Sequence, residues 1–273
     1  MNNRFAVFIL SHGRAKTLTS YDVLRKSGYT GDVFIIVDDL DEQKDDYISI
    51  YGDKVIIFDK NKFYKLTDTM EPSGELRSIT FARNASNVIA KQLGLTYHAQ
   101  FDDDVTGLYH KYIGKDGKLK TRRITDFDSV VCAILDFLDD TGAVSCGLVD
   151  TGSLFGGASG PFRNGLAYNF NQTVICRTGA LDFVGLGNQD VNALMLNSPR
   201  GKLLFELYCI AHSVSKPGNA GGMTEMYKVR GLYHKIFLFV MCAPSMCYMT
   251  EENKLVIQRK NVVPKILSSR WKK

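Results

Sequence analysis

Paired cysteines and a hydrophobic run long enough to cross a membrane are both missing from this chain of 273 residues. Its six cysteines are scattered, without the C-x-x-C spacing of zinc or redox sites, so we expect reduced thiols and a cytoplasmic protein, in the host cytoplasm if the chain is viral. The apolar run at 5–10 is followed by Ser-His-Gly-Arg rather than a cleavage site, and the run at 236–249 is shorter than a membrane span. We therefore expect neither a signal peptide nor a membrane segment, and nothing indicates an obligate protein partner.

The chain also lacks internal repeats, low-complexity stretches and a linker, so one domain over 1–273 is the simplest organisation. Hydrophobic residues make up 45% and charged residues 23%, as in an ordinary globular protein. The net charge of +5 is uneven, because residues 110–123 contribute +5 and residues 259–273 contribute +6, which leaves −6 for the rest. Two basic segments on an acidic body favour an anionic polymer such as nucleic acid, although a solubilising tail also explains the second segment.

The first sixty residues alternate between strand and helix patterns. Continuous apolar runs predict buried strands at Phe5–Leu10, Val33–Val37 and Val55–Phe58, with helices at 18–26 and 47–51 between them. This β-α-β-α-β order predicts an α/β fold, a Rossmann-like and mostly parallel sheet with helices on both faces. The loops after the first two strands should then meet at the carboxyl edge of the sheet, where ligands bind.

Those two loops offer groups suited to a nucleotide. Backbone amides near Ser11 and His12, together with the Arg14 guanidinium, can contact a phosphate or a nucleobase. Asp38, or Asp39 as second choice, occupies the position from which a carboxylate bonds a ribose hydroxyl or a base edge. Simple turn chemistry is the alternative for this acidic pair.

Three consecutive carboxylates follow a helix–strand unit that begins at Arg83 and Asn84. Residues two apart in a strand share a face, so Asp102 and Asp104 are placed to hold one metal while Asp103 points elsewhere. Ligation by oxygen alone suits Mg²⁺ or Mn²⁺. A solvated acidic turn is the alternative.

Further along, a basic hairpin is predicted from Tyr109 to Arg123 around a turn at 115–118, and its cations interleaved with tyrosines suit phosphate contact and stacking, or simply solvation. Residues 61–80 form a polar connection in which Arg77, otherwise a surface charge, is expected to face the crevice. The remaining predicted elements are a helix at 127–139, a strand at 143–149, an irregular acceptor-side loop at 153–165, and strands at 166–176 and 203–210.

A Gly-rich turn, GLGNQD, places Asp190 on the first turn of a helix. The alternative explanation is that Asp190 stabilises the helix by interacting favourably with the helix dipole and has no catalytic role. However, the segments FILSHGRA, IVDD, ARNASN, FDDDV and GNQD occur in an order that resembles the nucleotide-sugar glycosyltransferases with the A-type fold. Within them the chain is most similar to the bacteriophage DNA-modifying group, the TET-associated glycosyltransferases of 5-hydroxymethylpyrimidines.

This resemblance implies a UDP-sugar donor, Mn²⁺ or Mg²⁺, and double-stranded DNA carrying 5-hydroxymethylcytosine as acceptor. It implies that Asp190 is the general base, although Gln189 replaces the family's usual Glu, and that His212, otherwise a structural histidine, completes a metal site with Asp102 and Asp104. The implied donor-binding residues are Ser11, His12, Arg14, Asp38, Asp39, Arg77, Arg83, Asn84 and Asp103, and the DNA-binding cations are Lys111, Lys118, Lys120, Arg122, Arg123, Arg270 and Lys272.

On this interpretation residues 1–105 bind the donor, 106–258 bind the acceptor, and 259–273 form a basic tail. Two alternatives stay open: a transferase acting on a glycan or protein, and a non-catalytic DNA-binding relative. A nucleotidyltransferase is disfavoured, because the chain has no Gly-rich phosphate loop. The sugar, the stereochemistry, the DNA sequence context and the oligomeric state are not specified by the sequence.

Overall fold

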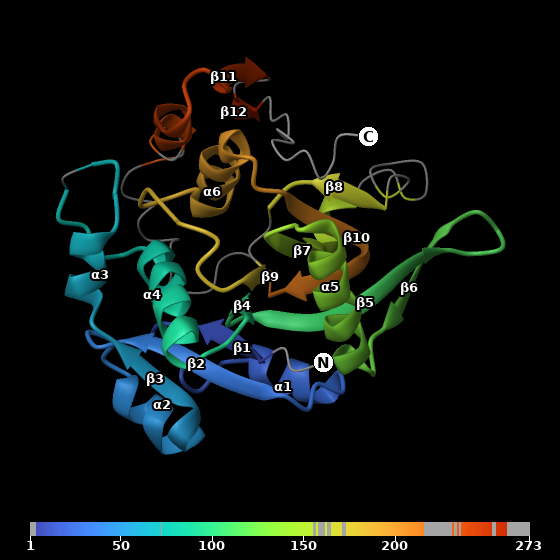
Figure 1. The fold of residues 1–273 in the computed structure, drawn as a ribbon, viewed down its shortest axis with the longest axis horizontal. Coiled ribbons are helices and arrows are strands. Elements are labelled where there is room, and N and C mark those ends of the chain that lie inside the picture. Colours follow the sequence, from blue (N-terminus) through green and yellow to red (C-terminus); the bar gives the residue numbers. More distant parts are fainter. Residues whose placement is uncertain are drawn as a thin grey trace.

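The structure is a computed structural model, and it describes residues 4–71, 73–154, 157, 162, 165–170, 173–215, 231, 234, 236–252 and 255–260. Within these residues a ten-stranded sheet forms the centre of the molecule, with helices packed on it (Figure 1). The strand order is β3-β2-β1-β4-β9-β7-β10-β5-β6, and β8 pairs with β10.

The first four strands are parallel to one another, as the β-α-β-α-β pattern predicts, whereas β4 pairs with β9 in the antiparallel direction. They are β1 (Phe5–Leu10), β2 (Asp32–Asp38), β3 (Val55–Phe58) and β4 (Tyr97–Asp102), connected through α1 (Ser20–Lys26), α2 (Lys44–Tyr51), η1 (Gly52–Lys54), α3 (Lys60–Leu66) and α4 (Ile79–Gln92). Because parallel strands end at one edge, the loops after β1, β2, β3 and β4 meet at the carboxyl edge of the sheet.

The remaining strands make the sheet mixed. They are β5 (Val105–Ile113), β6 (Leu119–Arg123), β7 (Ser145–Asp150), β8 (Leu166–Tyr168), β9 (Val174–Arg177) and β10 (Leu204–Val214), with α5 (Phe127–Thr141), η2 (Thr151–Ser153), α6 (Gln189–Asn197) and η5 (Ser198–Arg200) between them. A separate two-stranded sheet, β11 (Cys247–Glu252) and β12 (Leu255–Lys260), follows a helical segment at 236–242. Among the described residues no helix is long and apolar enough to cross a membrane.

Alternation along the strands divides the core between the two faces of the sheet. In β1, Val7 and Ile9 pack with residues of α1, α2 and α5, whereas Ala6, Phe8 and Leu10 pack with residues of α3 and α4. A third cluster beneath α6 joins it to β9 and β10. Among the described residues, helices therefore cover both faces of the sheet, as predicted.

Several predicted boundaries are wrong for local reasons. Residues 61–80 are not only a polar connection, because α3 forms there with Asp59 as its cap, although only Phe63 and Lys60 of this helix are buried. The predicted strand at 166–176 is two strands, β8 and β9, which pair with different neighbours. The strand predicted at 203–210 continues to Val214. The basic tail begins inside β12, which ends at Lys260.

Candidate active site

The loop after β1 is tied to the middle carboxylate of the acidic triplet. Ser11 Oγ donates to Asp103 Oδ2 at 2.7 Å and lies 2.6 Å from the Tyr47 hydroxyl, which also accepts from the Arg14 amide. Arg14 Nη1 lies 2.5 Å from Asp103 Oδ1 and 3.7 Å from Asp104 Oδ2. Burial raises the pKa of Asp103, while Arg14 and Ser11 oppose that shift. Ser11, Arg14 and Asp103 are thus brought together, but through contacts that already use much of their bonding capacity.

A second polar cluster lies where the loops after β1, β2 and β3 meet. His12 Nδ1 is 2.8 Å from Asp38 Oδ2 and 3.4 Å from Asp41 Oδ2, and Lys60 Nζ is 3.1 Å from Asp38 Oδ2. The hydrogen bond with Asp38 raises the pKa of His12. Burial alone would raise the pKa of Asp38, yet His12 and Lys60 hold it below its usual value. The other Asp38 oxygen, Oδ1, is buried, and no group in the described part of the chain forms a hydrogen bond with it.

In the part of the chain that the structure describes, His12, Asp38 and Asp41 are the one set of three ligating side chains whose donor atoms lie within 4.8 Å of one another. Their charge is already compensated, because Lys60 contacts Asp38 and the amides of Gly13 and Gln43 donate to Asp41. A cation would have to displace these donors, so the free Asp38 oxygen suits an N–H or O–H donor of a ligand better than a metal. The neighbouring Asp39 has a structural contact, since its Oδ1 accepts from the Lys60 amide at 2.8 Å.

Helix α4 fixes the position of Asp102, the first carboxylate of the triplet, through the Arg83 side chain. Arg83 is 0% exposed, and its Nη2 donates to Asp102 Oδ1 at 3.3 Å. Its Nη1 donates to Gln100 Oε1 at 3.0 Å, Gln100 Nε2 returns a bond to the Arg83 carbonyl, and the guanidinium lies 5.6 Å from the Phe183 ring centre. The Arg83 side chain is thus buried as the counter-charge of Asp102, and its implied role in donor binding stays a prediction.

The asparagines of the same helix hold a distant segment. Asn84 Nδ2 donates to the Phe183 carbonyl at 2.9 Å and to Thr67 Oγ1 at 3.0 Å, while Asn84 Oδ1 accepts from the Phe183 amide at 3.1 Å. One turn later Asn87 Nδ2 donates to the Leu181 carbonyl at 2.8 Å. The predicted donor contact of Asn84 is therefore replaced by a positioning contact, because its amide is already occupied by the backbone that leads to α6.

That segment places Asp190 on the first turn of α6, as the sequence predicts. Gly185 has a φ of +81° and Asn188 a φ of +54°, and a side chain at Gly185 would collide with Asn192 Nδ2. Asn192 Nδ2 also donates to the Gly187 carbonyl at 3.1 Å. The backbone conformation of the GLGNQD turn is therefore restrained by its positive φ values and by the contacts of Asn192. These restraints fix the position of the helix start that carries Asp190.

The two acidic motifs meet in space. Burial raises the pKa of Asp102 to about 6; the Arg83 charge opposes the shift, whereas Asp104, Asp103 and Asp190 reinforce it. Carboxylates 88 positions apart in the chain, at 102 and 190, are thus close enough to act on one another electrostatically.

The predicted metal partner His212 lies in β10, with Leu108 and Asp150 as its neighbours on β5 and β7. It is 1% exposed, and its Nδ1 has no hydrogen-bond partner among the described residues. Burial lowers its pKa, while Asp150 and Asp104 oppose that shift. Asp104 itself accepts from Ser215 Oγ at 3.3 Å. The ligand atoms of Asp102, Asp104 and His212 are not gathered within 4.8 Å, so this metal set stays a prediction.

The other predicted residues lie further out. Arg77 forms a bidentate pair with Glu75 in the connection before α4, and its side chain is about half exposed. The predicted hairpin forms as β5 and β6. It holds Lys111, Lys118, Lys120, Arg122 and Arg123, whereas Arg270 and Lys272 lie outside the described residues. A role in binding donor or DNA stays a prediction for all of them.

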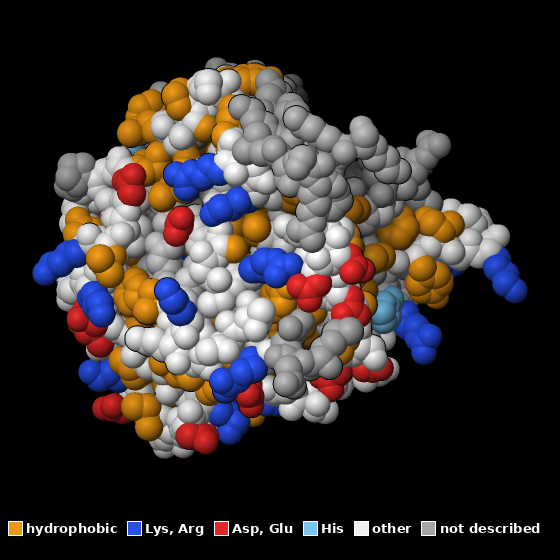
Figure 2. All heavy atoms as spheres, viewed as in Figure 1, with side chains coloured by type: hydrophobic (Ala, Val, Ile, Leu, Met, Phe, Trp, Pro, Cys, Tyr) orange, Lys and Arg blue, Asp and Glu red, His pale blue; other side chains and the backbone are white. Residues whose placement is uncertain are grey.

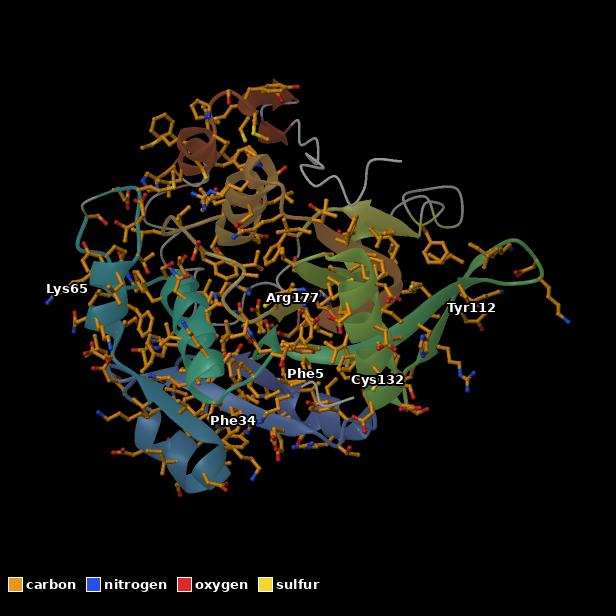
Figure 3. All side chains as sticks on the ribbon, viewed as in Figure 1. Phe5, Phe34, Lys65, Tyr112, Cys132 and Arg177 are labelled. Carbon is orange, nitrogen blue, oxygen red and sulfur yellow. The ribbon has the colours of Figure 1, made fainter. Side chains whose placement is uncertain are left out.

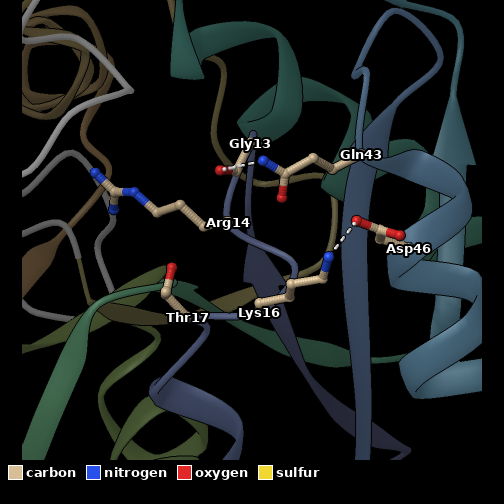
Figure 4. Close-up of a pocket in the computed structure, with 6 residues that line it drawn as sticks. All are labelled: Gly13, Arg14, Lys16, Thr17, Gln43 and Asp46. Carbon is tan, nitrogen blue, oxygen red and sulfur yellow. Dashed lines mark hydrogen bonds and ion pairs between the residues drawn. The ribbon is translucent and has the colours of Figure 1, made fainter.

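A shallow hollow of about 210 Å³ opens beside the β1 loop, lined by Gly13, Arg14, Lys16, Thr17, Gln43 and Asp46. The Arg14 side chain points away from Gln43 and Asp46, and a Lys16–Asp46 pair of 3.3 Å crosses one side (Figure 4). Asp102 and Asp104 do not line it. We therefore place the chemistry at the carboxylates and treat the hollow as a neighbouring surface.

Several residues that contribute contacts to the site were not predicted from the sequence, namely Tyr47, Lys60, Asp41, Gln100 and Phe183. Lys60 had a usable signal, because it follows β3 at the carboxyl edge just as Asp38 ends β2. Gln100 also had one, since it shares a face of β4 with Asp102 two residues later. Tyr47 and Phe183 are aromatic residues within apolar patterns and carry no such signal.

Known proteins resemble this chain in family and in fold. The family model of the TET-associated glycosyltransferases matches residues 5–222. No curated protein matches the chain. Glucosyl-3-phosphoglycerate synthase from Mycobacterium tuberculosis, solved in complex with Mg²⁺ and UDP, has a similar fold, with a TM-score of 0.52 at 9% identity over 97% of this chain and 89% of that one.

The same enzyme solved with Mn²⁺, UDP-glucose and phosphoglyceric acid gives a TM-score of 0.52 at 10% identity over 96% of this chain and 88% of that one. A further mycobacterial protein gives 0.51 at 10% identity over 97% and 85% of the two chains. At such identities these structures establish the A-type fold alone, while the family match spans most of the chain. The protein belongs to the TET-associated glycosyltransferase family, and it is a glycosyltransferase.

Proposed function

We propose that this enzyme transfers a sugar from a UDP-sugar to the hydroxymethyl group of 5-hydroxymethylcytosine in double-stranded phage DNA, with Mn²⁺ or Mg²⁺ as cofactor. The observation that supports it best is the convergence of Asp102 and Asp190, whose charges act on one another at the carboxyl edge. Family membership favours the DNA acceptor. The similar fold of an enzyme that binds UDP-glucose and Mn²⁺ favours the donor and the cofactor.

The donor is assigned to residues 1–105. The unpartnered Asp38 Oδ1 is a buried acceptor that a ribose hydroxyl or a base N–H can satisfy, and the half-exposed His12 borders the same cluster. Arg14 contacts two carboxylates and stands between the loop after β1 and the triplet. Arg77 is the exposed guanidinium nearest in sequence to α4, and we keep it as a candidate for the diphosphate.

The residues at the triplet suit a divalent cation. Burial is the main cause of the raised pKa of Asp102, and the buried His212 Nδ1 has no hydrogen-bond partner among the described residues, so both groups would gain from a metal. Asp102 and Asp104 would hold the ion through oxygen donors that Mg²⁺ and Mn²⁺ accept, and His212 would add a nitrogen donor. When bound there it would stabilise the charge of the departing diphosphate by several kcal/mol.

Asp190 is the group placed to remove the acceptor proton. It lies on the first turn of α6, at a helix start that the GLGNQD turn fixes. As the hydroxymethyl oxygen bonds to the anomeric carbon, the bond to the UDP oxygen breaks and the hydroxyl proton passes to the Asp190 carboxylate. Such general-base assistance is typically worth 10² to 10⁴ in rate. The neighbouring Gln189, where the family usually has Glu, is buried and supplies no second acid.

We expect the acceptor base to flip out of the stack, which would let its hydroxymethyl oxygen reach Asp190 at this edge. The cations of β5 and β6 would bind the flanking phosphates, and affinity should fall steeply with salt. A glycan or protein acceptor requires neither the cations nor the salt dependence, which separates the alternatives.

The test combines Mn²⁺, several UDP-sugars and DNA with or without 5-hydroxymethylcytosine, followed by mass spectrometry of the digested nucleosides. A mass gain of one sugar on the hydroxymethylated base alone supports the proposal, and Asp190→Asn should remove most of it. A folded protein that modifies no DNA with any donor contradicts it. Sugar transfer to a glycan or peptide under the same conditions would favour the alternative acceptor.

A further inference from the structure

The hairpin of β5 and β6 begins at the acidic triplet, pairs with β10 as far as His110, and then leaves the body of the protein as an arm. Val105 opens β5 directly after Asp104, and the loop between the strands projects at the right of Figure 1. Eight residue steps from Val105 to Ile113, at about 3.3 Å each, place the end of β5 about 26 Å from the triplet. The arm therefore reaches well beyond a flipped base.

One face of this arm is occupied by its own contacts. Paired residues of antiparallel strands share a face, so Tyr109 and Arg123 lie together with Lys111 and Thr121. Arg123 lies 6.0 Å from the Tyr109 ring centre, and Lys111 Nζ donates to Thr121 Oγ1 at 2.8 Å. The Tyr109 ring also folds over Gly107, leaving no room for a side chain there. We call this the braced face, because it stiffens the root of the arm.

The opposite face, which we call the open face, consists of His110, Tyr112, Lys120 and Arg122. Tyr112 is 46% exposed (Figure 3), and Arg122 makes no ion pair within the described residues. Lys120 pairs with Asp116 at 2.7 Å, but both side chains are exposed and such pairs contribute little. Cations, a histidine and apolar side chains are visible together on the projecting arm (Figure 2). This combination fits a phosphate backbone with a stacking partner.

We propose that the open face of the arm binds duplex DNA about eight base pairs from the base in the active site, so that the enzyme requires a minimum duplex length. Arg122 and Lys120 contact phosphates, and Tyr112 packs on an adjacent sugar. The stiff braced face keeps this distance constant. The inference rests on the proposed function, which places the target base beside Asp190.

Binding of unmodified duplexes tests it without any catalysis. Fluorescence anisotropy would compare duplexes of about 12 and about 30 base pairs, since only the longer one reaches the arm from a central base. The ratio of the affinity for the long duplex to that for the short duplex should be about tenfold higher in the wild type than in Lys120→Glu/Arg122→Glu. The ratio for Tyr112→Ala should lie between these two values. The matched control is Lys62→Glu/Lys65→Glu in α3, which makes the same charge change at two exposed positions on the far side of the sheet and should behave as the wild type.

Circular dichroism melting would establish that all variants are folded. The same long-to-short affinity ratio in the wild type and the arm variant, or an equal loss on both duplexes, would overturn the inference. Sugar transfer is scored separately on hydroxymethylated DNA of both lengths. Length-dependent binding without transfer would uphold the arm and refute the acceptor, whereas transfer insensitive to length and to the arm variant would refute the arm alone.

Discussion

The cations of the carboxyl edge and those of the arm have opposite surroundings. Arg14, Lys60 and Arg83 lie 2.5, 3.1 and 3.3 Å from aspartate oxygens, and Lys60 and Arg83 are buried. Lys118 and Arg122 on the arm are exposed and make no ion pair among the described residues. A buried cation cannot leave its partner without stranding a charge, whereas an exposed one is free to meet a ligand.

Positive charge has a different role at the carboxyl edge and on the arm. At the edge, cations fix the geometry of carboxylates before any substrate arrives, which is the preorganisation that catalysis needs. On the arm, cations supply attraction that is general, long-ranged and sensitive to salt. The same residue types therefore predict different consequences when they are removed.

The largest effect is expected from Arg83→Met. Removing one partner of a buried pair leaves Asp102 with an uncompensated charge and Gln100 without its donor, so unfolding free energy should fall by about 3–5 kcal/mol. Urea titration followed by circular dichroism measures it. A loss below about 0.5 kcal/mol, the usual range for surface changes, would mean that the pair is not a structural element.

Asp190→Asn should affect the reaction and not the fold. The first turn of α6 keeps its shape, but the proton acceptor is lost, and kcat for transfer should fall by a factor on the order of 10² to 10⁴. Steady-state kinetics with saturating donor gives the value, and Asp182→Asn, an acid in the segment before α6, is the control. Equal losses in the two variants would remove Asp190 from the mechanism.

A pH-dependent effect of intermediate size is expected from Asp102. Its pKa rises from 3.8 to about 6 in the folded protein, so between these values the folded state keeps a proton that the unfolded chain has released. Stability should therefore fall as pH rises through this window and stay lowered above it. Relative to the wild type, Asp102→Asn should gain about 2 kcal/mol between pH 4 and pH 8. Urea titrations at the two pH values measure this gain, and a difference independent of pH would contradict the shift.

Much of the fold could be predicted because its strands are continuous apolar runs that end in polar loops. Phe5–Leu10, Val33–Val37 and Val55–Phe58 therefore lie in β1, β2 and β3. Helix α3 could not be predicted in the same way, since it buries only Phe63 and Lys60 and depends on the Asp59 cap. Periodicity detects a helix through its apolar face, and this helix has almost none.

For the site, the sequence predicted positions better than contacts. The ends of strands identified Asp38 and the triplet, and the Gly-rich turn identified the helix start at Asp190. It could not predict the observed contacts of Arg83 and Asn84, because both bond to groups brought near by tertiary packing, one on β4 and one at Phe183. Their implied roles in donor binding stay predictions. Local spacing shows which residues share an element, but not which distant backbone segment will lie against it.

The smallest effect on stability is expected from a substitution in the arm. The contrast between the two regions is clearest when the same substitution, Lys to Met, is made in each of them. Lys118→Met removes an exposed charge and should alter unfolding free energy by less than about 0.5 kcal/mol. Lys60→Met removes a buried one, takes away the cation that lies 3.1 Å from Asp38 Oδ2, and should cost several times more. For DNA binding the order reverses, because losing one phosphate contact should lower the slope of log affinity against log salt by about 1 in Lys118→Met alone. Titrations of duplex DNA at several salt concentrations measure it, and an equal change of slope in Lys60→Met would show that the two groups of cations are not functionally distinct.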